Sequence, residues 1–173
     1  MMKWMLAGLA LLLCANVQAL EVEQAYRMIP HQRTVFLLNR TNLPASEAQQ
    51  VAKLLTLAEK AMVERVNALH NGARKTGYQS RVVSILRQLN ELPVPGQVDA
   101  ARDHIVAALR QHRVFFDLQV LTGDEASASR QALIQSSHRH LLQAYHLLMQ
   151  AYPDETRHNK QAFFDYLCAL DFI

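Results

Sequence analysis

The chain has 173 residues, of which 50% are apolar and 19% are charged, with a formal net charge of +3. Its five glycines and five prolines make up roughly 6% of the residues, about half of the share in average proteins. This composition excludes collagen-like and disordered chains, and the scarcity of turn residues excludes an all-β sandwich, so we expect an all-α fold.

The first 19 residues have the features of a secretory signal peptide. A cationic start at Lys3 precedes the apolar run Met5–Leu13, and small residues around Ala19 suit cleavage by signal peptidase. An uncleaved membrane anchor is disfavoured, because Asn16 and Gln18 interrupt the run before it reaches the ~20 apolar residues that a span needs. We therefore expect a periplasmic or secreted protein that is cleaved near Ala19.

Export leaves Cys168 as the single cysteine of the mature chain, because Cys14 is removed with the signal peptide. A lipid anchor on Cys14 is disfavoured, since the large residue Leu13 precedes it where the attachment motif has a small one. Without a partner, Cys168 forms no internal disulfide. The sequence leaves open whether Cys168 is a buried apolar residue or forms an intermolecular bridge.

Residues 20–45 form an N-terminal arm that lacks a sustained helical period. A short helix fits residues 21–28, but the following segment mixes proline, cations and β-branched side chains. Functional residues often gather where regular structure stops. An extended segment with Arg27, His31 and Arg33 can therefore form part of a ligand or partner site, and the alternative, which the sequence favours, is an arm that packs on the helices.

Four main helices follow the arm and form, with a C-terminal helix, a single up-and-down bundle over residues 46–173. The C-terminal helix begins after Pro153, with Asp154 as its cap, and a capping box at Ser46 begins the first main helix. Short connections make consecutive helices antiparallel. The apolar stripes and the positions of glycine and proline predict main helices over 46–70, 78–92, 97–122 and 128–151.

The most basic stretch covers residues 70–77 and continues to Arg81 and Arg87. Such a stretch can contact an anionic partner or a membrane surface, with Arg74, Lys75 and Arg81 as candidate contacts. A solvated loop with basic flanks is the structural alternative. We do not expect nucleic acid as a partner, because the stretch lacks interleaved aromatic side chains.

Two pairs of histidines fall at matching heights in the hairpin of the third and fourth main helices. With the turn centred near residue 125, His112 lies opposite His138, and His104 lies opposite His146. Neutral imidazoles that face each other inside a bundle can bind a metal ion or a non-covalent haem. The same four residues also fit hydrogen-bonded core histidines, so both interpretations stand.

The sequence contains no motif of the common catalytic or nucleotide-binding classes. G-x-S-x-G, H-E-x-x-H and C-x-x-C-H are all absent, and a single E-x-x-H match at Glu155 is too few for a di-metal bundle. An enzyme is therefore disfavoured. The sequence favours an exported, non-enzymatic binding or scaffolding protein for an envelope protein or small ligand, and the alternative is a metal- or haem-binding bundle.

Overall fold

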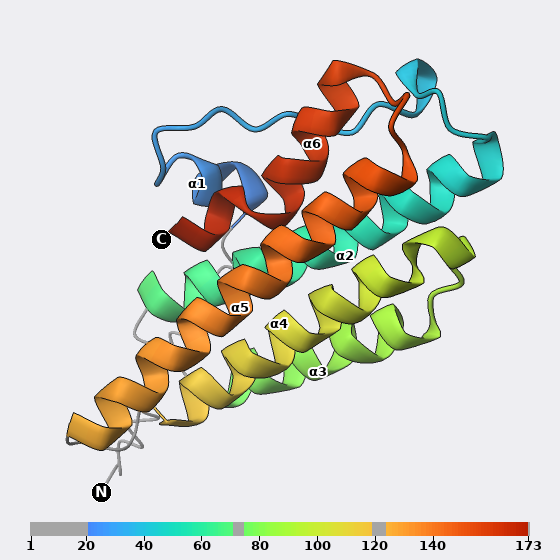
Figure 1. Cartoon of the computed structure of the whole chain (residues 1–173). Coiled ribbons are helices and arrows are strands. Elements are labelled where there is room, and N and C mark those ends of the chain that lie inside the picture. The colour runs from blue at the N-terminus through green and yellow to red at the C-terminus, as the bar shows by residue number, and fades with distance from the viewer. Residues whose placement is uncertain (1–20, 71–74, 119–123, 173) are drawn as a thin grey trace, which may run out of the picture.

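A computed structural model describes residues 21–70, 75–118 and 124–172, and these form an all-α bundle without strands (Figure 1). The predicted fold class is therefore confirmed. The predicted signal peptide lies outside the described residues and stays a prediction. The four long helices run up and down in turn as α2 (Ala45–His70), α3 (Lys75–Glu91), α4 (Asp99–Leu118) and α5 (Asp124–Ala151).

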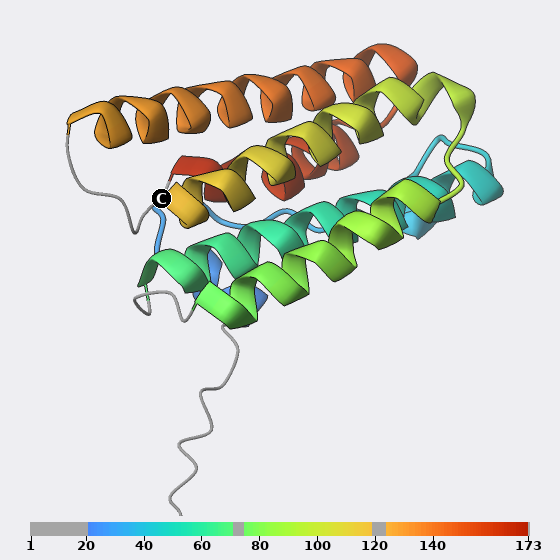
Figure 2. The same ribbon diagram turned by 90° about the horizontal axis from the view of Figure 1, so that it is seen from below.

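The C-terminal helix closes the bundle. α4 packs against α5 on one side and α3 on the other, and α3 packs beside α2. α6 (Arg157–Leu167) contacts both α2 and α5, and so joins the first long helix to the last (Figure 2). Of the helices that the structure describes, none combines the length and the apolar content needed to cross a membrane.

The arm begins with the short helix α1 (Val22–Tyr26) and then has no regular structure until the 3₁₀ turn η1 (Leu38–Arg40). α1 packs on α2, and the extended part of the arm runs along α6 (Figure 1). Two further 3₁₀ turns follow, η2 (Gly96–Val98) before α4 and η3 (Ala169–Phe172) after α6. The irregular arm is thus present as predicted.

Buried apolar side chains from all six α-helices form one core. The largest of them include Tyr78, Phe116 and Phe163, and the ring of Phe163 stacks on Phe36 of the arm with 5.9 Å between ring centres. Cys168 is a free cysteine within this core, where burial raises the pKa of its thiol to about 12. Because the thiol is buried, it is not exposed for a bridge to another chain.

Two helix caps differ from the prediction. α2 begins at Ala45, directly after Pro44, so Ser46 lies within the first turn and does not cap the helix. α6 is capped by Thr156 and not by Asp154. The backbone of Thr156 is extended, with φ −61° and ψ 148°, which lets its hydroxyl accept a backbone N–H of the first turn at 3.2 Å.

Candidate functional site

The arm is anchored to α6 through Asp165, which is fully buried. Its carboxylate accepts hydrogen bonds from Nε2 of His31 (2.7 Å), the backbone N–H of Thr34 (2.6 Å) and Nε2 of Gln161 (2.9 Å). Its backbone carbonyl accepts a further bond from the hydroxyl of Tyr26 (2.6 Å). Because a carboxylate only accepts, Nε2 of His31 carries the hydrogen of this bond, and Nδ1 is the ring nitrogen that Asp165 does not contact.

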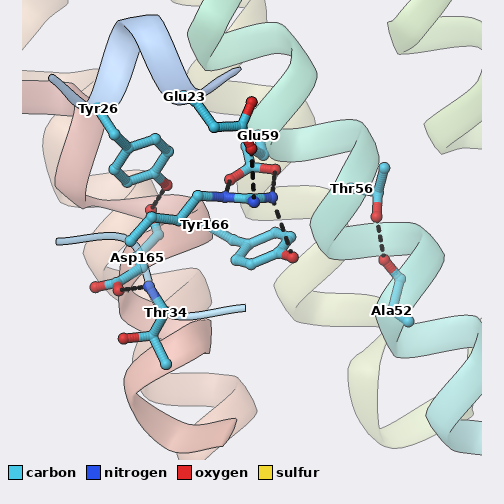
Figure 3. Close-up of polar contacts among 9 residues, drawn as sticks. Glu23, Tyr26, Thr34, Ala52, Thr56, Glu59, Asp165 and Tyr166 are labelled. Carbon is cyan, nitrogen blue, oxygen red and sulfur yellow. Dashed lines mark hydrogen bonds and ion pairs between the residues drawn. The ribbon is translucent and has the colours of Figure 1, made fainter. Parts of the chain in front are cut away.

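Arg33 anchors the arm to α2 through Glu59, which Figure 3 labels close to Glu23 and Tyr166. Its guanidinium donates two hydrogen bonds to Glu59, of 2.7 and 2.6 Å, and a longer one of 3.4 Å to Glu23. It also lies 5.1 Å from the ring centre of Tyr166 and 5.8 Å from that of Tyr26. The bonds to Glu59 raise the pKa of Arg33, so this side chain stays charged and its donors are taken by the protein itself.

Side chains on and just before α6 satisfy the backbone of the irregular segment. The amide of Asn159 accepts the N–H of Leu37 at 2.9 Å and donates to the carbonyl of Leu37 at 3.2 Å. Glu155 accepts bonds from the hydroxyl of Thr41 and the N–H of Asn42. Burial acts to raise the pKa of Glu155, but these donors hold it below its usual value. The arm therefore follows a fixed path without a helix or sheet of its own.

A pocket of about 440 Å³ opens beside these anchors, and all of its walls come from the arm. This volume lies in the range of about 300–1,000 Å³ that is typical of small-molecule sites. Arg27 is exposed, and its side chain has no ion pair or hydrogen bond to the described residues. The pocket is lined by Glu23, Tyr26, Arg27, Ile29, His31, Gln32 and Arg33.

The three predicted arm residues thus line one pocket but have different roles. Arg33 is a structural anchor, because carboxylates of the protein occupy its guanidinium. His31 is oriented by a buried carboxylate. Arg27 is the cation that remains open to an occupant of the pocket.

The predicted anion-binding residues after the arm do not form one described surface. Arg74 lies outside the described residues, and Lys75 is the first residue of α3. Arg81 donates from Nε to Oε2 of Glu64 at 2.6 Å, and Glu64 is buried. Arg81 therefore serves as an ion-pair partner between α3 and α2.

Two of the predicted histidines, His112 and His138, lie on either side of one carboxylate. Asp171 is 2.8 Å from Nδ1 of His138 and 3.7 Å from Nε2 of the buried His112, and Arg65 lies 3.9 Å away. Burial lowers the pKa of His112 and so favours its neutral form. Burial acts to raise the pKa of Asp171, but His112 and Arg65 hold it below its usual value.

His104 and His146 are not brought together. Nδ1 of His104 lies 2.8 Å from Nδ1 of His140, whereas the ring of His146 lies beside that of Tyr145, with 5.5 Å between ring centres. The ring centres of His104 and His140 are 5.1 Å apart, so the two nitrogens point at each other and share one hydrogen. Among residues 21–70, 75–118 and 124–172, no three His, Cys, Asp or Glu side chains are grouped to hold a metal ion.

Sequence reasoning does not identify the acids that hold these groups. Glu59, Asp165 and Asp171 are buried, and each interrupts an apolar segment of the sequence. Acidic side chains are seldom buried unless they are paired, because an unpaired buried charge is costly. An acid within an apolar run was therefore the available signal for a buried polar cluster.

Comparison of the chain with protein-family models, with curated proteins and with solved structures gives no match.

Proposed function

We propose that the chain is an exported, non-enzymatic binding protein and that its ligand or partner occupies the arm pocket. The observation that carries this proposal is a pocket of about 440 Å³ whose walls are held by buried anchors. A site that is ordered before binding loses less entropy when it is filled. The signal peptide predicted at residues 1–19 supports export, and with it an envelope protein or a small molecule of the periplasm as the occupant.

The pocket offers three kinds of contact. Arg27 supplies an exposed cation, the imidazole of His31 supplies a polar ring nitrogen, Nδ1, and Ile29 supplies apolar surface. A matching occupant carries an anionic group, a polar group that hydrogen-bonds with His31, and an apolar part. Amino acids and hydroxy acids have this chemistry, as does a surface segment of a partner protein that bears a carboxylate.

Photo-crosslinking in cells tests this proposal. A photoreactive side chain is placed at Gln32, which lines the pocket, and for comparison at Lys53, which is exposed on α2. We expect an adduct at position 32 and not at position 53. Arg27→Glu should abolish the adduct, whereas Arg40→Glu, at an exposed arginine of the arm outside the pocket, should not. Equal labelling at both positions, or none at position 32, would contradict the proposal.

The second candidate function is metal or haem binding, and it is tested on the same purified protein. The observation in its favour is that Asp171 lies near both His112 and His138, although these three side chains are not grouped closely enough to hold a metal ion as they stand. Stoichiometric metal or a haem absorption band that is lost in His112→Ala would support this candidate. A colourless protein without metal would count against it.

A further inference from the structure

A second hollow, of about 310 Å³, lies between α3 and α4 and is here named the arginine hollow. Arg87 lines it from α3, and Arg110 and Arg113 line it from α4. Glu91 is the one acidic residue in this lining, so the lining has two positive charges in excess. Val83 adds apolar surface and is 46% exposed.

Most donors of these guanidinium groups make no hydrogen bond or ion pair with the described residues. Arg87 and Arg110 are exposed, and their side chains make no ion pair or hydrogen bond with any described residue. Arg113 donates from Nε to Gln79 at 2.9 Å, which leaves its two terminal nitrogens without a partner in the same set of residues. By contrast, the guanidinium of Arg33 is occupied by carboxylates.

We propose that the arginine hollow binds a phosphate ester with an apolar or amphipathic body. A phosphate monoester carries about −1.5 to −2 charges at pH 7, which matches the charge excess of the lining. Guanidinium groups bind phosphate oxygens through paired hydrogen bonds and stay charged at physiological pH. Val83 offers the carbon part of the ester a surface to pack on. A soluble phosphorylated molecule and a phospholipid headgroup present the same group.

Calorimetric titration of the purified protein with phenyl phosphate tests the proposal. We expect one saturable site and roughly tenfold weaker binding of benzoate, which carries a single charge. The double variant Arg87→Gln/Arg110→Gln should bind phenyl phosphate roughly tenfold more weakly than the native protein. The control Arg40→Gln/Arg157→Gln removes the same charge from exposed arginines of η1 and α6 and should bind like the native protein.

Two further measurements check that the variants are folded and identify the source of the phosphate group. All four substituted arginines are exposed, so the melting temperatures of both double variants should match that of the native protein. Sedimentation with phosphatidylcholine vesicles, with and without phosphatidic acid, separates the two sources of phosphate. If the native protein and the control variant bind vesicles with phosphatidic acid and Arg87→Gln/Arg110→Gln does not, the ligand is a lipid headgroup. If these proteins differ in this way only in their binding of phenyl phosphate, the ligand is a soluble ester. Binding of neither probe, or equal loss in both double variants, overturns the proposal.

Discussion

Removal of the Arg33 side chain is expected to be costly, because it leaves a buried carboxylate without its partner. Glu59 is 2% exposed and accepts two short hydrogen bonds from Arg33. Removing one member of a buried ion pair costs about 3–5 kcal/mol. The side chain of Arg33 is itself 20% exposed, so we expect the lower end of that range, about 3 kcal/mol, for Arg33→Ala.

Equilibrium unfolding in urea, followed by far-UV circular dichroism, measures this loss of free energy. In a chain of this length, 1 kcal/mol corresponds to about 2–4 °C, so Arg33→Ala should melt roughly 6–12 °C below the native protein. The matched control is Arg27→Ala, which removes an exposed arginine of the same arm. It should change the free energy of unfolding by less than about 0.5 kcal/mol.

The double variant Arg33→Met/Glu59→Leu isolates the cause. If the unpaired carboxylate of Glu59 accounts for the loss, replacing both partners with apolar side chains should recover about 2 kcal/mol relative to Arg33→Ala. A loss below about 1 kcal/mol in Arg33→Ala would refute the reasoning. A double variant as unstable as the single variant would refute it too.

Three other changes test the remaining contacts. Asp165→Asn turns one acceptor for Thr34 or His31 into a donor. We expect the free energy of unfolding to fall by about 2–3 kcal/mol and amide hydrogen exchange over residues 31–37 to become faster. Unchanged exchange would show that Asp165 does not hold the arm. Because the pKa of His112 is lowered from 6.5 in the fold, the unfolded chain takes up the proton first, and the stability that this group contributes is lost as pH falls below about 6.5. His112→Gln should flatten that slope in urea titrations at a series of pH values, and an unchanged slope would assign it to other groups. The buried thiol of Cys168, with a pKa of about 12, should react with an aromatic disulfide reagent only as fast as the protein opens, so rapid labelling of the native protein would contradict its burial.

Most of the glycines and prolines in the described residues lie next to helix ends and so predict the helices well; the exceptions are Pro30 in the arm and Gly77, which lies in the first turn of α3. α3 ends at Glu91, two residues before Pro93, and α2 begins directly after Pro44. Caps are harder to predict, because several polar residues compete for one position. Asp154 and Thr156 both precede α6. Thr156 caps the helix, because it lies directly before the first turn and its backbone is extended.

The histidines show what helical periodicity does not determine. Counting residues from the turn places His104 at the height of His146, but the actual height of its partner depends on the turn and on how the helices pack. His104 therefore meets His140, six residues before His146. The arginine hollow is a second example of a contact that helical periodicity does not predict. Arg87 of α3 lines it together with Arg110 and Arg113, which come from the next helix.

The candidate residues of the arm could be found from the sequence because helical periodicity is missing there. Their anchors could not, because Asp165 contacts His31 across 134 residues of sequence. Contacts of that separation leave no periodic pattern in a single sequence. A buried acid in an apolar segment indicates that a partner exists but does not say which residue it is.

The sequence separation of these anchors also determines when the arm becomes ordered. The arm is synthesised before the long helices, yet Asn159 and Asp165 follow the segments that they hold by 122 to 134 residues. Until α6 has been made, Leu37 and Thr34 lack these acceptors for their backbone N–H groups. Contacts between distant parts of a chain also form slowly during folding. The arm pocket is therefore a late product of folding, present only in molecules whose bundle is complete.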